Sequence, residues 1–209
     1  FIEKSNLKDK IREMIDNTSV DNTEELNKNT AKIRELIVNA SLPNDLEDDI
    51  IESYQLMDVN KEAVENSVGI AREILKRGSD SAFVAVRSSA TTEDLVDASF
   101  AGQQETFINV KGVEKLLESV KKCFASLFTA RAVYYRKKRV FKHDSALLAV
   151  VIQKMVDSEK SGVIFSRNPI GDQENIVIEA VYGQGEGIVS GRIKPDYYLI
   201  SRNLEILEK

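Results

Sequence analysis

Apolar positions recur at helical spacing through the first eighty residues of the chain. Two stripes precede Pro43, and they consist of Leu7, Ile11, Met14 and Ile15 and of Leu26, Ile33, Leu36 and Ile37. After Pro43, Asn44 and Asn60 are each placed to cap a further helix, and Gly78 is expected to end the last one. The pattern therefore predicts a helical part over residues 1–80.

Short apolar runs rich in valine, isoleucine and phenylalanine replace this pattern from Ser81 onward. The predicted strands cover residues 82–88, 105–110, 147–155, 162–167, 175–182 and 196–201. Between the second and third strands, residues 113–141 have helical spacing, with a break between two helices near Thr129. This order indicates an α+β protein with a helical part and a mixed, mainly antiparallel sheet part.

Composition narrows the compartment of the protein. Of the 209 residues, 42% are hydrophobic and 30% charged, and no apolar run is long enough to cross a bilayer. The charged amino terminus does not resemble a signal peptide, so we expect a cytoplasmic protein with no membrane partner. The single cysteine, Cys123, allows no intrachain disulfide, and its helical spacing with Leu116, Val120 and Phe124 predicts a position in the core.

The net charge and one basic cluster indicate whether a nucleic acid partner is expected. The net charge of −5 makes a nucleic acid partner unexpected. One basic cluster, residues 131–142, includes two tyrosines and has two interpretations. It could bind RNA, or it could form a solvated basic helix face that covers its own apolar side, and the second is the usual meaning of such a run.

The segment 86–110 carries the most unusual chemistry. Arg87 ends a predicted strand and offers a fixed, charged fork suited to phosphate oxygens. A stretch dense in Ser, Thr, Gly, Asp and Glu follows, and within it Gly102 permits close approach of backbone to a ligand. Hydroxyl donors for a polyphosphate would come from Ser88, Ser89, Thr91 and Thr92. Alternatively, Arg87 pairs with Glu93 or Asp94 and the hydroxyls make local turns.

A glycine-rich segment, residues 182–196, lies between two predicted strands. Its glycines do not fit the dinucleotide-binding fingerprint, no long helix is expected after it, and no P-loop sequence occurs in the chain. Glu179 and Glu186 could approach a magnesium ion or a ribose hydroxyl, since magnesium prefers hard oxygen ligands. An ordinary tight turn with solvated carboxylates explains the same residues equally well.

The run 147–167 also has two interpretations. An apolar strand passes through Gln153, Met155 and Val156 into a short polar turn and then another strand. Such a connection can offer backbone groups to a purine edge and side chains to its ring faces. A plain hairpin with core side chains is the simpler interpretation and is favoured on this pattern alone.

The single histidine, His143, has no nucleophile pattern near it, and we expect a surface or capping role for it.

Four segments resemble the phosphoenolpyruvate synthases, in the same order as in that family. They are VRSSATTEDLVDASFAGQQETFINV, IQKMV, SGVIFSRNP and YGQGEGIVSGRIKPD. The resemblance is close over residues 80–201, and it implies an ATP-grasp-like domain that binds ATP with magnesium between two subdomains. Residues 1–80 would be the helical part of the first subdomain, and residues 81–145 would carry its phosphate-binding loop. Residues 146–209 would be the sheet of the second subdomain, cut short.

The same resemblance implies a role for individual residues. Arg87 would contact the triphosphate, Gly102 and Thr106 would line the phosphate side, and Gln153, Met155 and Val156 would form the adenine-contacting hinge. In the family's reaction ATP donates its β-phosphoryl group to a histidine on a separate swivelling domain. The γ-phosphate is released to water, and pyruvate becomes phosphoenolpyruvate. A positive group such as Arg87 suits phosphoryl transfer, which depends on positioning and charge stabilisation.

The resemblance also indicates what these residues lack. The family's phosphate-binding lysine segment would stand before Phe1 and its metal-holding segment after Lys209, so the metal ligands are unknown. A phosphohistidine swivel domain and a pyruvate-binding barrel in the same polypeptide are the expected partners, and a homo-oligomer is left open. We expect residues 1–209 alone not to complete the reaction. The alternatives are a rifampicin phosphotransferase, a pyruvate phosphate dikinase, or a non-catalytic adenine-nucleotide-binding module.

Overall fold

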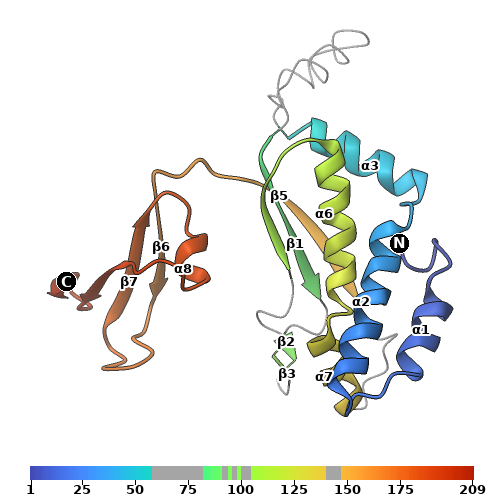
Figure 1. Ribbon diagram of the computed structural model, residues 1–209. Helices are drawn as coiled ribbons and strands as arrows, with labels where there is room; N and C mark the ends of the chain where they lie inside the picture. Colours follow the sequence, from blue (N-terminus) through green and yellow to red (C-terminus); the bar gives the residue numbers. More distant parts are fainter. Residues whose placement is uncertain (58–81, 91–93, 96–97, 100–104, 140–146) are drawn as a thin grey trace, which may run out of the picture. The chain divides into compact units, whose positions relative to one another are not determined.

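The computed structural model describes residues 1–57, 82–90, 94–95, 98–99, 105–139 and 147–209 (Figure 1). The chain divides into two compact units, Phe1–Met155 and Val156–Lys209, called unit 1 and unit 2 below. Helices and antiparallel sheets occur together, so the predicted α+β class is confirmed. The helix expected after Asn60 and its end at Gly78 lie outside the described residues.

The described helices of unit 1 follow the predicted pattern closely. They are α1 (Lys8–Asp16), α2 (Thr23–Asn39), α3 (Asn44–Gln55), α6 (Val113–Ser126) and α7 (Ala130–Lys138). The side chain of Thr129 caps α7 by accepting a hydrogen bond of 3.3 Å from the Ala132 N–H, which confirms the break predicted there. Asn44 is the first residue of α3 rather than its cap, and Pro43 precedes it.

The helices of unit 1 bury a common core. The second predicted stripe supplies Leu26, Ile33 and Ile37, each at most 5% exposed. Ile11 and Ile15 from α1 pack into the same cluster, together with residues around the α6–α7 turn. The apolar stripes therefore form these helices because each stripe can be removed from water against the others.

A three-stranded antiparallel sheet completes unit 1. Its order is β4 (Thr106–Val110), β1 (Val84–Ala90) and β5 (Leu148–Lys154). One face packs against α6, which lies alongside the sheet in Figure 1, and this layer buries Val84, Val86, Leu116, Val120 and Cys123. The short strands β2 (Asp94–Leu95) and β3 (Ala98–Ser99) pair separately, within the stretch predicted as a loop.

The pairing of β4 with β1 contains a β-bulge. Val84 pairs with Val110, whereas Val86 pairs with Phe107, so β4 has one residue more than β1 between these pairs. Asn109 lies in this interval with φ of 57°, in the left-handed region that asparagine tolerates better than most residues.

Tyr54 connects three segments of unit 1. Its hydroxyl donates a hydrogen bond of 2.8 Å to the Ala82 carbonyl and accepts one of 2.9 Å from the Gly112 N–H. The ring is buried at 2% exposure against the sheet and α6. The end of α3 is thereby joined to the residues that precede β1 and α6.

Unit 2 is a four-stranded antiparallel meander. It consists of β6 (Lys160–Phe165), β7 (Ile176–Tyr182), β8 (Asp196–Ile200) and β9 (Ile206–Glu208), with the short helix α8 (Glu186–Val189) before β8. The first three strands were predicted from the sequence, and β9 was not. All residues of unit 2 are described, and Val177, at 4% exposure, is the one hydrophobic residue among them that is buried.

The plain hairpin favoured for the run 147–167 is wrong. β5 pairs with β1 in unit 1, and β6 pairs with β7 in unit 2, so the polar turn between β5 and β6 joins two sheets. For the same reason the unit boundary falls after Met155, and β5 belongs with the sheet that carries Arg87 rather than with the sheet expected over 146–209.

Candidate functional site

The face of the unit 1 sheet opposite α6 carries several of the predicted site residues. In β1 the side chains alternate, so Val84 and Val86 face α6 while Arg87 faces the other way. Val150 and Ile152 of β5 pack on the α6 side, and their neighbours Val151 and Gln153 are exposed. This second face, called the open face below, is therefore defined by alternation and by exposure together.

Arg87, Thr106 and Gln153 share the open face. Arg87 pairs directly with Thr106 on β4, and Ala85 pairs directly with Gln153 on β5. Paired residues of an antiparallel sheet point to the same side, and so do residues two apart in one strand. All three side chains are exposed. The fold thus brings together a guanidinium, a hydroxyl and an amide that are separated by up to 66 positions in the sequence.

The serines beside Arg87 divide between the two faces. Ser89 is exposed and lies on the open face, opposite Ala149. Ser88 pairs with Val150 on the α6 side, where its hydroxyl is buried and has no hydrogen-bond partner among the described residues. Ser89 can therefore serve a ligand above the open face, and Ser88 cannot. Thr91, Thr92 and Glu93 lie outside the described residues.

The predicted hinge residues lie at the end of the first sheet. The Met155 N–H donates a hydrogen bond of 2.8 Å to the Phe83 carbonyl, which continues the β1–β5 pairing beyond Lys154. Met155 is half-buried, and Val156, the first residue of unit 2, is 75% exposed. Gly102, the remaining predicted phosphate-side residue, lies outside the described residues.

Phe83 is a residue on this face that the sequence did not single out. Its side chain is 51% exposed, and it stands four positions before Arg87, which places both on the same side of the strand. The Lys111 ammonium lies 5.0 Å from the centre of its ring. The even spacing from Arg87 was visible in the sequence, but in AFVAVRS the ring is indistinguishable from a core residue.

Cys123 is a core residue, as its spacing predicted. It is fully buried, and its thiol approaches the Val86 carbonyl at 3.6 Å. Burial raises the pKa of the Cys123 thiol to about 12, and the negative charge of Glu105 adds to the shift. A thiol with so high a pKa is not a nucleophile at neutral pH.

The basic cluster 131–142 has a structural use in its described part. Arg136 is 2% exposed, and its guanidinium donates to the Leu127 carbonyl at 2.5 Å. Burial lowers the pKa of Arg136 to about 10, which leaves it charged at neutral pH. Lys137 donates to the Thr18 carbonyl at 2.8 Å, and Lys138 pairs with Asp21 at 2.7 Å. These contacts hold α7 against the α1–α2 connection, so the solvated-face interpretation is only partly right. His143 lies outside the described residues.

The glycine-rich segment of unit 2 forms turns around a helix of one turn. Gly183 and Gly191 have φ of 77° and 67°, and α8 spans only four residues, in agreement with the rejection of a dinucleotide fingerprint. Glu179 is half-buried in β7 and Glu186 is exposed in α8. Within the described ranges, no group of three His, Cys, Asp or Glu side chains is placed to hold a metal ion.

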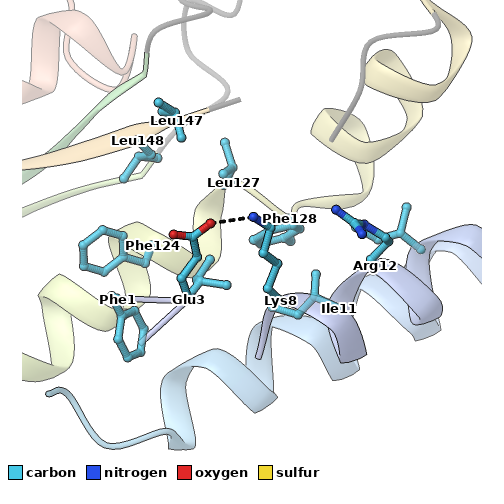
Figure 2. Close-up of a pocket in the computed structure, with 12 residues that line it drawn as sticks. Phe1, Glu3, Lys8, Ile11, Arg12, Phe124, Leu127, Phe128, Leu147 and Leu148 are labelled. Atoms are coloured by element: carbon cyan, nitrogen blue, oxygen red, sulfur yellow. Dashed lines mark hydrogen bonds and ion pairs between the residues drawn. The ribbon is translucent and has the colours of Figure 1, made fainter. Parts of the chain in front are cut away.

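A cavity of about 250 Å³ in unit 1 is lined by residues of α1, the end of α6 and the start of β5 (Figure 2). Phe1, Phe124, Leu127 and Phe128 contribute to its wall. Lys8 and Glu3 also line it and form an ion pair of 2.5 Å (Figure 2). It contains none of the predicted site residues. Among the helices that the structure describes, none is long and apolar enough to span a membrane.

Comparison with known proteins defines the family. Residues 1–209 match the family described as pyruvate phosphate dikinase, AMP/ATP-binding domain. The chain belongs to this family. Its relatives include a probable phosphoenolpyruvate synthase of Methanocaldococcus jannaschii, 45% identical over 211 residues, which cover 100% of this chain and 16% of that protein.

Two further relatives carry the same name. The phosphoenolpyruvate synthase of Pyrococcus furiosus is 43% identical over 198 residues, covering 94% of this chain and 22% of that protein. That of Aeropyrum pernix is 57% identical over 127 residues, covering 60% of this chain and 16% of that protein. The resemblance to the phosphoenolpyruvate synthases is thereby confirmed, and the chain spans a quarter or less of the length of each of these three relatives.

Proposed function

We propose that this chain is the ATP-binding part of a phosphoenolpyruvate synthase. In the proposed reaction ATP, pyruvate and water give AMP, phosphoenolpyruvate and phosphate, through a phosphohistidine on another domain of the same polypeptide. The observation that carries the proposal is the shared face of Arg87, Thr106 and Gln153 in the unit 1 sheet. The names of the relatives support the choice of enzyme.

Each of the proposed roles uses the chemistry of its side chain. Arg87 would bind the triphosphate with its planar fork, and the Thr106 hydroxyl beside it would donate to the same phosphate oxygens. Gln153, with Met155 and Val156, would recognise the adenine edge, because an amide side chain and backbone groups can match its donors and acceptors. Gly102 would allow backbone to approach the phosphates.

Magnesium and the compartment complete the proposal. Mg²⁺ would accompany ATP, since it binds phosphate oxygens and few protein ligands, and its protein ligands are not assigned. A cytoplasmic location fits a chain whose one cysteine is buried and forms no disulfide. A phosphohistidine swivel domain and a pyruvate-binding barrel are the proposed partners.

Substitution of Arg87 in the intact polypeptide tests the function. We expect Arg87→Ala to lower ATP-dependent phosphorylation by about a hundredfold or more, because a positioned charge on the transferring group is lost. Its free energy of unfolding should stay within about 0.5 kcal/mol of the wild type, since Arg87 is exposed. Arg87→Lys should recover only part of the rate, because the charge remains and the fork does not.

Arg131→Ala is the matched control. Arg131 is also an exposed arginine of unit 1, but it lies on α7, so its loss should leave turnover unchanged. Wild-type turnover of ATP by Arg87→Ala would refute the assignment of Arg87 to the phosphates.

A further inference from the structure

Phe83 and Arg87 mark out a segment of the open face that has an aromatic end and a cationic end. Phe83 directly precedes β1, with its ring half in solvent, and Arg87 is the fourth residue of that strand. The Met155–Phe83 backbone hydrogen bond places the ring next to the predicted hinge. Between the two ends, Ala85 and its pair Gln153 occupy the same face.

The distance between these ends matches the length of a nucleotide. Four residues of antiparallel strand span about 14 Å at about 3.4 Å per residue. An extended ATP molecule covers a similar distance from its base to its terminal phosphates. With the triphosphate on Arg87 and Thr106, the base would therefore reach the level of Phe83 and Met155, passing Gln153 on the way.

The chemistry of the two ends fixes the direction in which the nucleotide lies. A polyphosphate needs the guanidinium at Arg87, whereas a planar base gains most from an aromatic ring. Val151 and Met155, which alternation places on the same face among the described residues, are not aromatic and offer no ring for stacking. Lys111 is placed over the Phe83 ring, and the cation–π contact favours a fixed orientation of that ring.

We propose that Phe83 is the residue on which the adenine base of ATP stacks when the triphosphate is held at Arg87. This inference rests on the proposed function, since it presupposes that the open face binds ATP. It adds a base-binding residue to a site whose predicted members contact the phosphates and the adenine edge. The rival explanation is that Phe83 and Lys111 are a local surface pair without a ligand.

Binding measurements on the intact polypeptide separate these explanations. ATP and inorganic tripolyphosphate, each with Mg²⁺, would be titrated by calorimetry into the wild type and Phe83→Ala. Loss of a stacked base should raise the Kd for ATP by about tenfold and leave the Kd for tripolyphosphate unchanged. Phe83→Tyr should retain wild-type affinity for ATP, because the ring remains.

Two control variants make the outcomes distinct. Tyr134→Ala removes a comparably exposed aromatic ring of unit 1 that also has a lysine over it, at 5.8 Å, and it should change neither affinity. Arg87→Ala should weaken both ligands.

Each alternative outcome overturns a different statement. If Arg87→Ala weakens ATP binding and Phe83→Ala does not, the stacking proposal is wrong and the ATP site stands. Equal weakening of ATP and tripolyphosphate by Phe83→Ala would also reject stacking. If neither variant affects ATP binding, the proposed function itself fails.

Discussion

The two units differ in how much of their apolar surface they bury. Within the described residues, unit 1 contains every buried hydrophobic side chain except Val177. Unit 2 leaves apolar side chains exposed on both faces of its sheet, including Ile164 at 67% on one face and Phe165 at 40% on the other. A sheet becomes stable by packing one face against a second layer. Unit 1 has a layer of helices for this purpose, whereas α8 is the one helix of unit 2. The stability of residues 1–209 should therefore reside in unit 1.

Thiol reactivity should show the largest difference between the units. Cys123 in unit 1 has its pKa raised to about 12, mainly by burial, so at neutral pH it has about a thousandfold less thiolate than an ordinary cysteine. A cysteine placed on unit 2 by Ile206→Cys, in a Cys123→Ala background, should react with a disulfide reagent about a thousandfold faster.

The pH dependence of the buried thiol has a defined sign. Because the folded state raises the pKa of Cys123 from 9.0 to about 12, the neutral thiol contributes its full stability below pH 9 and loses it as the pH rises towards 12.

In the reactivity experiment, similar reaction rates for Cys123 and for the cysteine at position 206 would show that Cys123 reaches solvent without unfolding of unit 1.

Truncation of one side chain in each unit should give the next largest difference. Leu116 is fully buried in unit 1, and Leu116→Ala should lower the free energy of unfolding by about 3 kcal/mol, through lost burial and a cavity. Ile164→Ala in unit 2 should change it by less than about 0.5 kcal/mol, because the side chain is exposed. Urea unfolding followed by circular dichroism measures both, and equal effects would contradict the comparison.

Loss of one hydroxyl should have the smallest of these effects. Tyr54→Phe leaves the Ala82 carbonyl and the Gly112 N–H without their partner, which should cost about 2 kcal/mol of unfolding free energy. Tyr134→Phe is the control, since Tyr134 is 44% exposed and its hydroxyl can bond to water. Hydrogen exchange at the Gly112 amide should become faster in Tyr54→Phe and not in Tyr134→Phe. An unchanged exchange rate in Tyr54→Phe would show that the hydrogen bond from Gly112 to Tyr54 is not formed in solution.

The strands were largely predictable from the sequence because alternation is local. The predicted strand ends for β1, β4, β5, β6, β7 and β8 lie within two residues of those observed. The hairpin prediction failed at β5 because a short polar turn between two strands looks the same whether the strands pair or not. The partner of β5 is β1, some 60 residues earlier, and local pattern does not report such a pairing.

The residues of the candidate site could be proposed from the sequence, but their arrangement on one face of the sheet could not. Arg87 and Gln153 could be proposed from their types and from the family resemblance. Their position on one face depends on the register of β1 with β5, which is a property of the folded sheet. For the same reason the sequence did not show which of Ser88 and Ser89 faces the candidate site, although the two side chains lie on opposite faces of the sheet.

The additional residue in β4 has a consequence for the whole site. With uninterrupted pairing from Val84 and Val110, Phe107 would stand opposite Arg87, and Thr106 would turn inward toward α6. The bulge at Asn109 places two residues of β4 between its two pairs, where uninterrupted pairing would place one. It thereby lets one short strand keep Val110 and Phe107 inside and still present Thr106 beside the guanidinium. Deleting Asn109 should place the Phe107 ring beside Arg87 in place of the Thr106 hydroxyl, although none of the residues proposed to bind ATP is substituted.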